Sequence, residues 1–212
     1  MGKVVALVSG GIDSPVAVYL TGRFVEVLPI FFDNSPFAGK DALERVLACC
    51  KILSRKVRLR FLHVFSHGKN LLEFSNACNR KFICVLCKRM MLRVAEKFAL
   101  EVGASSIITG DSLGQVASQT LQNLYVEDEA VKIPVLRPLL GFNKEEIVKI
   151  AREIGTYETS IMQVASCTVN PKRPAVKASL NKVLGEEGKV DIEKLTKETL
   201  NSKHKIPLNS LE

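Results

Sequence analysis

Aromatic residues and long apolar runs are scarce in this chain of 212 residues. Tryptophan is absent and tyrosine occurs three times, so there are few rings on which nucleic-acid bases could stack. No apolar run approaches the roughly 20 residues that span a bilayer, and no charged-then-apolar leader precedes the first apolar run. These absences predict a cytoplasmic protein with no membrane partner. The apolar share of 47% suffices for a packed core in one domain with at most a small addition.

Acidic residues are scarce in one segment, which holds the positive charge of the chain. The formal net charge is +8, and residues 51–100 carry 12 lysines and arginines against two acids, Glu73 and Glu96. Such a basic block suits contact with a nucleic-acid phosphate backbone, without reading of bases. A solvated basic face that binds no polyanion is the alternative.

Apolar runs alternate with helical patterns along the chain. The candidate strands are 4–8, 25–32, 57–65, 105–110 and 133–137. The candidate helices are about 15–22, 39–54, 86–102, 114–124 and 144–154, the last with a capping box of Asn143 and Glu146. This alternation predicts an α/β fold with a doubly wound, parallel five-stranded sheet and helices on both faces. Ligands of such sheets bind beyond the carboxyl ends of the strands, here after Phe32 and around Thr109-Gly110-Asp111.

The regular alternation ends near residue 155. Residues 156–175 are expected to form a loop, and 176–184 and 191–200 to form short helices. We therefore expect one main domain over 1–180 and a short helical C-terminal extension over 181–212.

A glycine-rich turn follows the first predicted strand. Its sequence, Ser9-Gly10-Gly11-Ile12-Asp13-Ser14, leads into Pro15, which suits a first helical turn. Backbone N–H groups of such a turn and of the helix N-terminus form an anion cradle, and Asp13 suits a phosphate if Mg²⁺ lies between them. The turn is neither a Walker A loop nor a dinucleotide fingerprint. A plain Gly-Gly turn with a serine cap is the alternative.

Cysteine is the other residue type with chemical potential here. Among the six cysteines, Cys84 and Cys87 form a C-x-x-C pair, and no second pair completes a zinc finger. Cys167 is the natural third ligand, and three cysteines would hold a [3Fe–4S] cluster or a [4Fe–4S] cluster with one open iron. A persulfide carried by Cys167 is the second interpretation, and three unrelated thiols are the third.

Several motifs resemble known enzymes. The turn at Ser9–Ser14 resembles the pyrophosphate-binding loop of PP-loop ATP pyrophosphatases, whose fold is the adenine nucleotide alpha hydrolase type. Residues 87–95, 109–124 and 136–139, and Cys167 followed by 174–178, resemble the tRNA 4-thiouridine synthases. The resemblance covers about residues 3–180, so the domain 1–180 is expected to be a PP-loop ATP-pyrophosphatase domain.

The resemblance implies a set of site residues. It assigns ATP to Leu7, Val8, Ser9, Gly10, Gly11, Ile12, Asp13, Ser14, Phe31, Phe32, Lys88, Gly110 and Gln119. Asp13, Lys88 and Cys167 would act in catalysis, Lys88 by stabilising charge on the α-phosphate and Cys167 by transferring sulfur. Cys84, Cys87 and Cys167 would be the ligands of the iron–sulfur cluster.

The resemblance also implies an activity, which is ATP-dependent sulfur transfer to tRNA. A uridine would be adenylated at O4 and the oxygen replaced by sulfur, with a sulfur donor protein or sulfide as source. An ATP-binding subunit that needs a separate RNA-binding chain is the alternative, as is a thiolase acting on another base or on a thiamine precursor. The family usually carries an N-terminal RNA-binding region and often a C-terminal rhodanese-type domain, neither of which is in this sequence. A homodimer would offer tRNA a larger surface.

Overall fold

A six-stranded sheet forms the centre of the protein. The computed structural model describes residues 2–39, 41–113 and 119–208, and within them the strand order is β5-β4-β1-β2-β3-β6. The strands are β1 (Lys3–Leu7), β2 (Glu26–Asp33), β3 (Phe61–Ser66), β4 (Ile107–Ile108), β5 (Val135–Leu136) and β6 (His204–Pro207). The first five pair in parallel, and β6 pairs antiparallel with β3.

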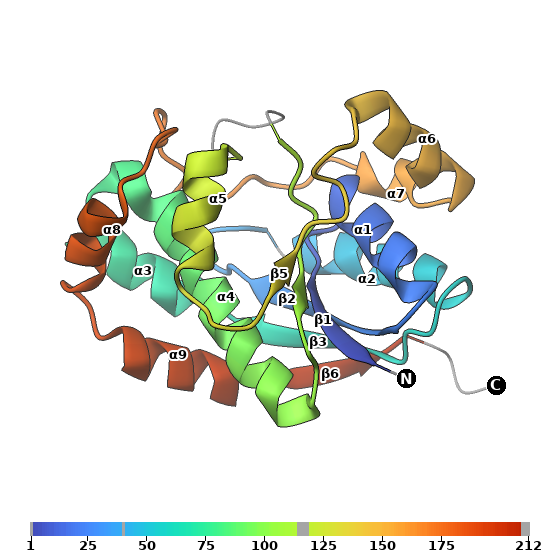
Figure 1. Ribbon diagram of the computed structural model, residues 1–212, viewed down its shortest axis with the longest axis horizontal. Coiled ribbons are helices and arrows are strands. Elements are labelled where there is room, and N and C mark those ends of the chain that lie inside the picture. The colour runs from blue at the N-terminus through green and yellow to red at the C-terminus, as the bar shows by residue number, and fades with distance from the viewer. Residues whose placement is uncertain (1, 40, 114–118, 209–212) are drawn as a thin grey trace.

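Helices cover both faces of the sheet (Figure 1). They are α1 (Asp13–Gly22), α2 (Asp41–Ser54), α3 (Gly68–Ala77), a 3₁₀ turn at Arg80–Phe82, α4 (Ile83–Val102), α5 (Leu121–Asp128), α6 (Lys144–Glu153), α7 (Tyr157–Ser160), α8 (Leu180–Glu187) and α9 (Ile192–Asn201). Figure 1 shows α1, α2, α6 and α7 on one side and α3, α4, α5, α8 and α9 on the other. None of the helices within the described ranges has both the length and the apolar content needed to cross a bilayer.

Alternating side chains of the strands supply two hydrophobic cores. In β1, Val4 and Ala6 pack with α1, α2 and α6, while Val5 packs with α4 on the other face. Side chains of a strand point alternately to opposite faces, so an uninterrupted apolar run is what a sheet buried on both faces requires. The prediction of a doubly wound α/β fold is therefore confirmed.

The predicted number of five strands was wrong because β6 was not foreseen. This strand lies in the stretch expected to be helical, and its residues are mostly exposed. An edge strand with one solvated side needs no apolar run, so its sequence resembles a loop. Two helices, α3 and α7, were also missed, and the predicted helix 114–124 falls partly outside the described residues, with α5 beginning at Leu121.

The capping box of α6 is confirmed. The Asn143 side chain accepts a hydrogen bond from the Glu146 N–H at 3.0 Å, and the Glu146 carboxylate accepts one from the Asn143 N–H at 2.7 Å. These bonds satisfy two backbone donors that a helix start leaves without partners. The local sequence therefore fixes where α6 begins.

Candidate active site

The Ser9–Ser14 turn connects β1 to α1 and closes on itself. The Ser9 N–H donates to Ser14 Oγ at 2.9 Å, and the Gly11 N–H donates to Ser9 Oγ at 3.4 Å. Gly10 has a φ of +69°, a conformation that glycine adopts without strain. No side chain of the described residues caps the start of α1, so the N-terminal N–H groups of this helix can serve an anion. Helix α1 begins at Asp13, so Pro15 is the third residue of the helix and lies within its first turn.

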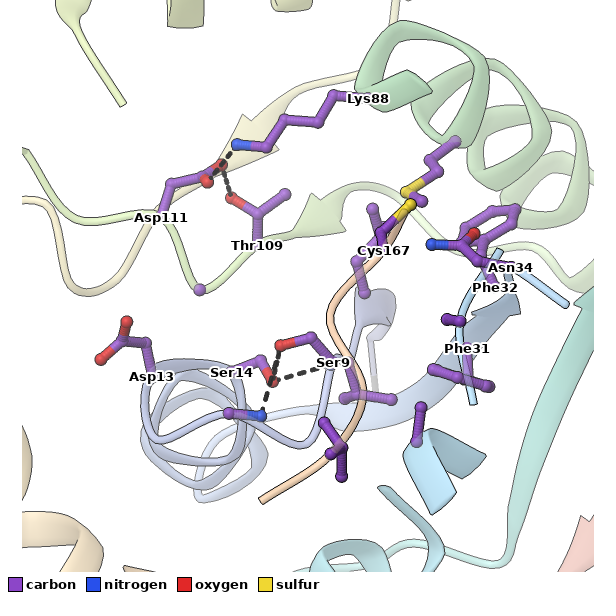
Figure 2. Close-up of a pocket in the computed structure, with 18 of the residues that line it drawn as sticks. Ser9, Asp13, Ser14, Phe31, Phe32, Asn34, Lys88, Thr109, Asp111 and Cys167 are labelled. Carbon is purple, nitrogen blue, oxygen red and sulfur yellow. Dashed lines mark hydrogen bonds and ion pairs between the residues drawn. The ribbon is translucent and has the colours of Figure 1, made fainter. Parts of the chain in front are cut away.

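A cavity of about 500 Å³ lies where the carboxyl ends of the strands meet. Most of the predicted nucleotide residues line it, namely Leu7, Val8, Ser9, Gly11, Asp13, Ser14, Phe31, Phe32, Lys88, Gly110 and Gln119. Cys167 lines the same cavity, whereas Gly10, Ile12, Cys84 and Cys87 are not among its lining residues. Figure 2 shows Ser9 and Ser14 on one side of the cavity, and Lys88 and Asp111 on the other.

Gly110 brings the end of β4 against the start of α1. A Cβ atom at this position would lie 2.7 Å from both the backbone N and Cα of Ser14, and 3.1 Å from the Asp13 carbonyl carbon. Such distances are far shorter than van der Waals contact, and backbone atoms cannot rotate away as a side chain can. Gly110 therefore lets two cavity walls approach each other.

Lys88 is held by two carboxylates. Its Nζ lies 2.6 Å from Asp111 Oδ1 and 3.5 Å from Glu127 Oε2. Asp111 also accepts hydrogen bonds from Thr109 Oγ1 at 2.8 Å and from Gln119 Nε2 at 3.2 Å, and Figure 2 draws the contacts of Lys88 and Thr109. The Lys88 charge is thus neutralised locally while its ammonium group stays at the cavity wall.

Burial and charge act in opposite directions on this network. Burial would lower the pKa of Lys88, but the Asp111 and Glu127 carboxylates hold it above its ordinary value. Burial would raise the pKa of Asp111, and Lys88 keeps it below its usual range. Burial raises the pKa of Glu127 to about 7, and its Oε1 is buried without a hydrogen-bond partner. At neutral pH, Lys88 and Asp111 are charged, and Glu127 is close to its pKa.

Known proteins resemble this chain in both sequence and fold. A sequence profile of the family described as Thiamine biosynthesis protein (ThiI) matches residues 1–192. The chain belongs to the ThiI family.

Curated relatives match almost the whole of this ThiI-family chain. A probable tRNA sulfurtransferase of Methanosarcina mazei is 45% identical over 202 residues, which are 94% of this chain and 50% of the relative. One of Caldanaerobacter subterraneus is 45% identical over 196 residues, which are 91% of this chain and 52% of the relative. The chain therefore spans about half the length of these relatives.

Solved structures support the family and the fold separately. A 4-thiouridine synthetase in an RNA complex with bound ATP superposes with a TM-score of 0.93 and 38% identity, covering 98% of this chain and 55% of the other. An NH3-dependent NAD synthetase from Campylobacter jejuni has a TM-score of 0.54 and 16% identity, covering 94% of this chain and 84% of the other. The second likeness shows a shared fold alone.

The Cys167 segment of the ThiI-family chain is fastened beside the cavity. The Thr168 N–H donates to the Phe37 carbonyl oxygen at 2.8 Å, and the Ala165 N–H donates to Asp41 Oδ2 at 3.1 Å. Arg45 Nη1 donates to the Met162 carbonyl oxygen at 2.9 Å. Three contacts with α2 and the loop before it thus hold the thiol in the wall of the cavity.

Cys84 and Cys87 lie on α4 near Cys167, behind the cavity wall. Burial raises the pKa of both thiols, and the Cys167 sulfur adds to this effect. Cys87 Sγ lies 3.3 Å from His67 Nε2, and Cys84 Sγ donates to Asn170 Oδ1 at 3.8 Å. Within the described ranges, no three side chains of His, Cys, Asp or Glu are grouped so that they could hold a metal ion.

Some residues of the cavity were not among the predicted site residues. They are Asn34, Ala38, Ala42, Arg45, Met91, Leu92, Thr109, Asp111, Glu127, Val164, Ala165, Ser166 and Asn170. The position of Thr109 and Asp111 directly after a strand was a usable signal. Arg45 and Glu127 lie within helices, and only the folded arrangement brings them to the cavity.

Proposed function

We propose that this chain is an ATP-dependent tRNA sulfurtransferase that converts uridine to 4-thiouridine. The observation that carries the proposal is that the Ser9–Ser14 cradle and the Cys167 thiol belong to one cavity. Adenylation of O4 and attack of sulfur at C4 act on the same carbonyl group of uridine, and a shared cavity permits both. The names of the curated relatives and the ATP and RNA of the structural neighbour support the same activity.

The first step is the adenylation of uridine O4. The oxygen attacks the α-phosphorus of ATP, and the bond to the bridging oxygen breaks to release pyrophosphate. N–H groups of the loop and the start of α1 stabilise the leaving charge, and Lys88 stabilises charge on the α-phosphate. Asp13 lines the cavity and would be the residue of this chain that holds Mg²⁺ together with phosphate oxygens of the nucleotide. When bound, the ion would neutralise charge on the pyrophosphate.

The second step replaces oxygen by sulfur. A carbonyl oxygen is a poor leaving group, whereas AMP is a good one, so sulfur can displace it from C4. Cys167 lines the cavity, and we assign sulfur delivery to it: the outer sulfur of a Cys167 persulfide displaces AMP from C4. A thiol reductant then attacks Cys167 Sγ and releases 4-thiouridine, and a second thiol reduces the disulfide that forms. Water in the cavity would regenerate uridine, so the enclosing walls favour the sulfur product.

Cys167 persulfide is the sulfur route that suits this geometry. An iron–sulfur cluster needs thiolates gathered around one centre. The described side chains offer no group of three metal ligands, so the three cysteines do not fit a cluster as they are arranged. The proposed reaction therefore does not use an iron–sulfur cluster.

The proposed tRNA substrate has consequences for binding, for cellular location and for the source of sulfur. The basic block of residues 51–100 supplies charge for the phosphate backbone of tRNA. A tRNA substrate implies a cytoplasmic enzyme. Before each turnover, a donor protein that carries a persulfide has to transfer its outer sulfur to the Cys167 thiolate, and the donor's own cysteine leaves as a thiolate.

Two variants separate the two steps. Asp13→Ala is expected to abolish ATP–pyrophosphate exchange and thiolation together. Cys167→Ala is expected to retain exchange and to lose thiolation, measured as 4-thiouridine by mass spectrometry of digested tRNA. Cys78→Ala, which removes a thiol outside the cavity lining, serves as the control. Normal thiolation by both site variants would refute the mechanism.

A second candidate is sulfur delivery to a thiamine precursor. It is favoured by the description of the matching family, which names thiamine biosynthesis. Cys167 persulfide would serve this route without the nucleotide cavity. In this route the precursor reaches the chain already activated, so that sulfur displaces a leaving group installed by another enzyme. Growth of a thiamine-requiring host with the Asp13→Ala variant would therefore distinguish it from the tRNA reaction, which needs adenylation in the cavity.

A further inference from the structure

The positively charged side chains of the cavity differ in whether a carboxylate pairs with them. Within the described part of the chain, Arg45 and Lys88 are the cationic residues that line it. Lys88 is already paired with Asp111 and Glu127. The ion pairs of the described residues do not include Arg45. Arg45 is therefore the cavity cation whose charge is uncompensated by a carboxylate.

Arg45 lies against the phosphate-binding turn. A Cβ atom at Gly10 would lie 3.3 Å from Arg45 Nε and 3.1 Å from the backbone N of Val46. The Gly10 conformation thus brings the turn directly onto α2. This contact places a guanidinium group beside the N–H groups of the cradle.

One donor of the guanidinium is satisfied and another is not. Arg45 Nη1 donates to the Met162 carbonyl oxygen, which fixes the orientation of the planar group. Arg45 Nε is buried and has no hydrogen-bond partner among the residues that the structure describes. A buried donor without a partner is unfavourable, and a phosphate oxygen in the cavity would relieve it with a charge-assisted bond.

We propose that Arg45 binds the β- and γ-phosphates of ATP, and thus the leaving pyrophosphate. The proposal rests on the proposed function, since it assumes that ATP occupies the cavity. Arginine suits this role because its rigid fork of donors matches phosphate oxygens and it stays charged. Lys88 then binds the α-phosphate, and Arg45 binds the departing pyrophosphate.

The competing explanation is that Arg45 is only an anchor for the Met162 backbone. An anchor would affect every nucleotide that uses the cavity. A contact with the outer phosphates would affect ATP and leave AMP unchanged, because AMP lacks those phosphates. The ratio of the two dissociation constants therefore separates the explanations.

The test is calorimetric titration of the full chain with ATP plus Mg²⁺ and, separately, with AMP. For Arg45→Gln we expect the Kd of ATP to rise at least tenfold and that of AMP to change less than twofold. Arg45→Lys keeps the charge but loses Nε and the fork, so a rise of about threefold for ATP alone is expected. Lys51→Gln removes the same charge from an exposed site on α2 and should leave both constants unchanged.

Equal weakening of ATP and AMP by Arg45→Gln would overturn the proposal in favour of an anchor. An unchanged ratio of ATP to AMP affinity in both Arg45 variants would also overturn it. If Arg45→Gln does not fold, the ratio measured for Arg45→Lys alone decides the question. The proposed function fails differently, since in that case the wild-type chain would not bind ATP at all.

Discussion

Gly110→Ala should damage both stability and nucleotide binding. The added methyl group would lie 2.7 Å from the Ser14 backbone N and Cα, so the start of α1 or the end of β4 has to move. Overpacking costs typically about 1–3 kcal/mol, and we expect about 3 kcal/mol because the nearest atoms belong to the backbone. Ser14 Oγ accepts the Ser9 N–H, so movement of Ser14 also distorts the cradle. We expect ATP affinity to fall at least tenfold, or about 1.4 kcal/mol.

Urea unfolding and ATP calorimetry measure the two effects of Gly110→Ala. Gly141→Ala is the matched control, because a Cβ atom there would meet nothing within 4 Å. The control should stay within about 0.5 kcal/mol of the wild-type protein, as surface substitutions usually do. If Gly110→Ala is as stable as the control and binds ATP as tightly, the close approach of β4 and α1 is not required and our reasoning is refuted.

Three further changes test other parts of the structure. Glu187→Ala should lower the free energy of unfolding by about 3–5 kcal/mol in urea titrations, because it leaves the buried Arg89 without its carboxylate partner. Glu127 has a pKa raised from 4.5 to about 7, so the folded state holds a proton that the unfolded state releases, and its contribution to stability falls as pH rises between these values. Glu127→Gln should remove this loss. The free energy of unfolding of the variant, relative to that of the wild-type protein, should therefore rise by about 3 kcal/mol from pH 4.5 to 8. A difference that does not change with pH would contradict the raised pKa of Glu127. Gly185→Ala should raise the melting temperature, since alanine stabilises a helix interior by up to about 1 kcal/mol and nothing lies within 4 Å of the added Cβ.

Local chemistry made part of the fold and site predictable. The Gly10-Gly11 turn, the apolar run before it and the capping box of α6 each act over a few residues, so sequence alone places them. The parallel sheet followed from the alternation of strands and helices. The cavity at the strand ends followed from the topology that this alternation implies.

Long-range contacts made the rest unpredictable. Arg45 and Glu127 reach the cavity from helices that bury other side chains, and no local pattern marks them. The spacing of Cys84 and Cys87 suggested two metal ligands, but it carries no information about His67, which lies beside Cys87 in the fold. β6 escaped prediction because an exposed edge strand depends on its partner β3 for stability.

Both edges of the sheet discourage pairing with another chain. At one edge, β5 is two residues long, and at the other, β6 exposes His204 and Lys205 and ends at Pro207. Short strands, lysine and proline are the devices by which proteins prevent intermolecular strand addition. We therefore expect assembly with a second copy or another protein to use helices and loops in preference to added strands.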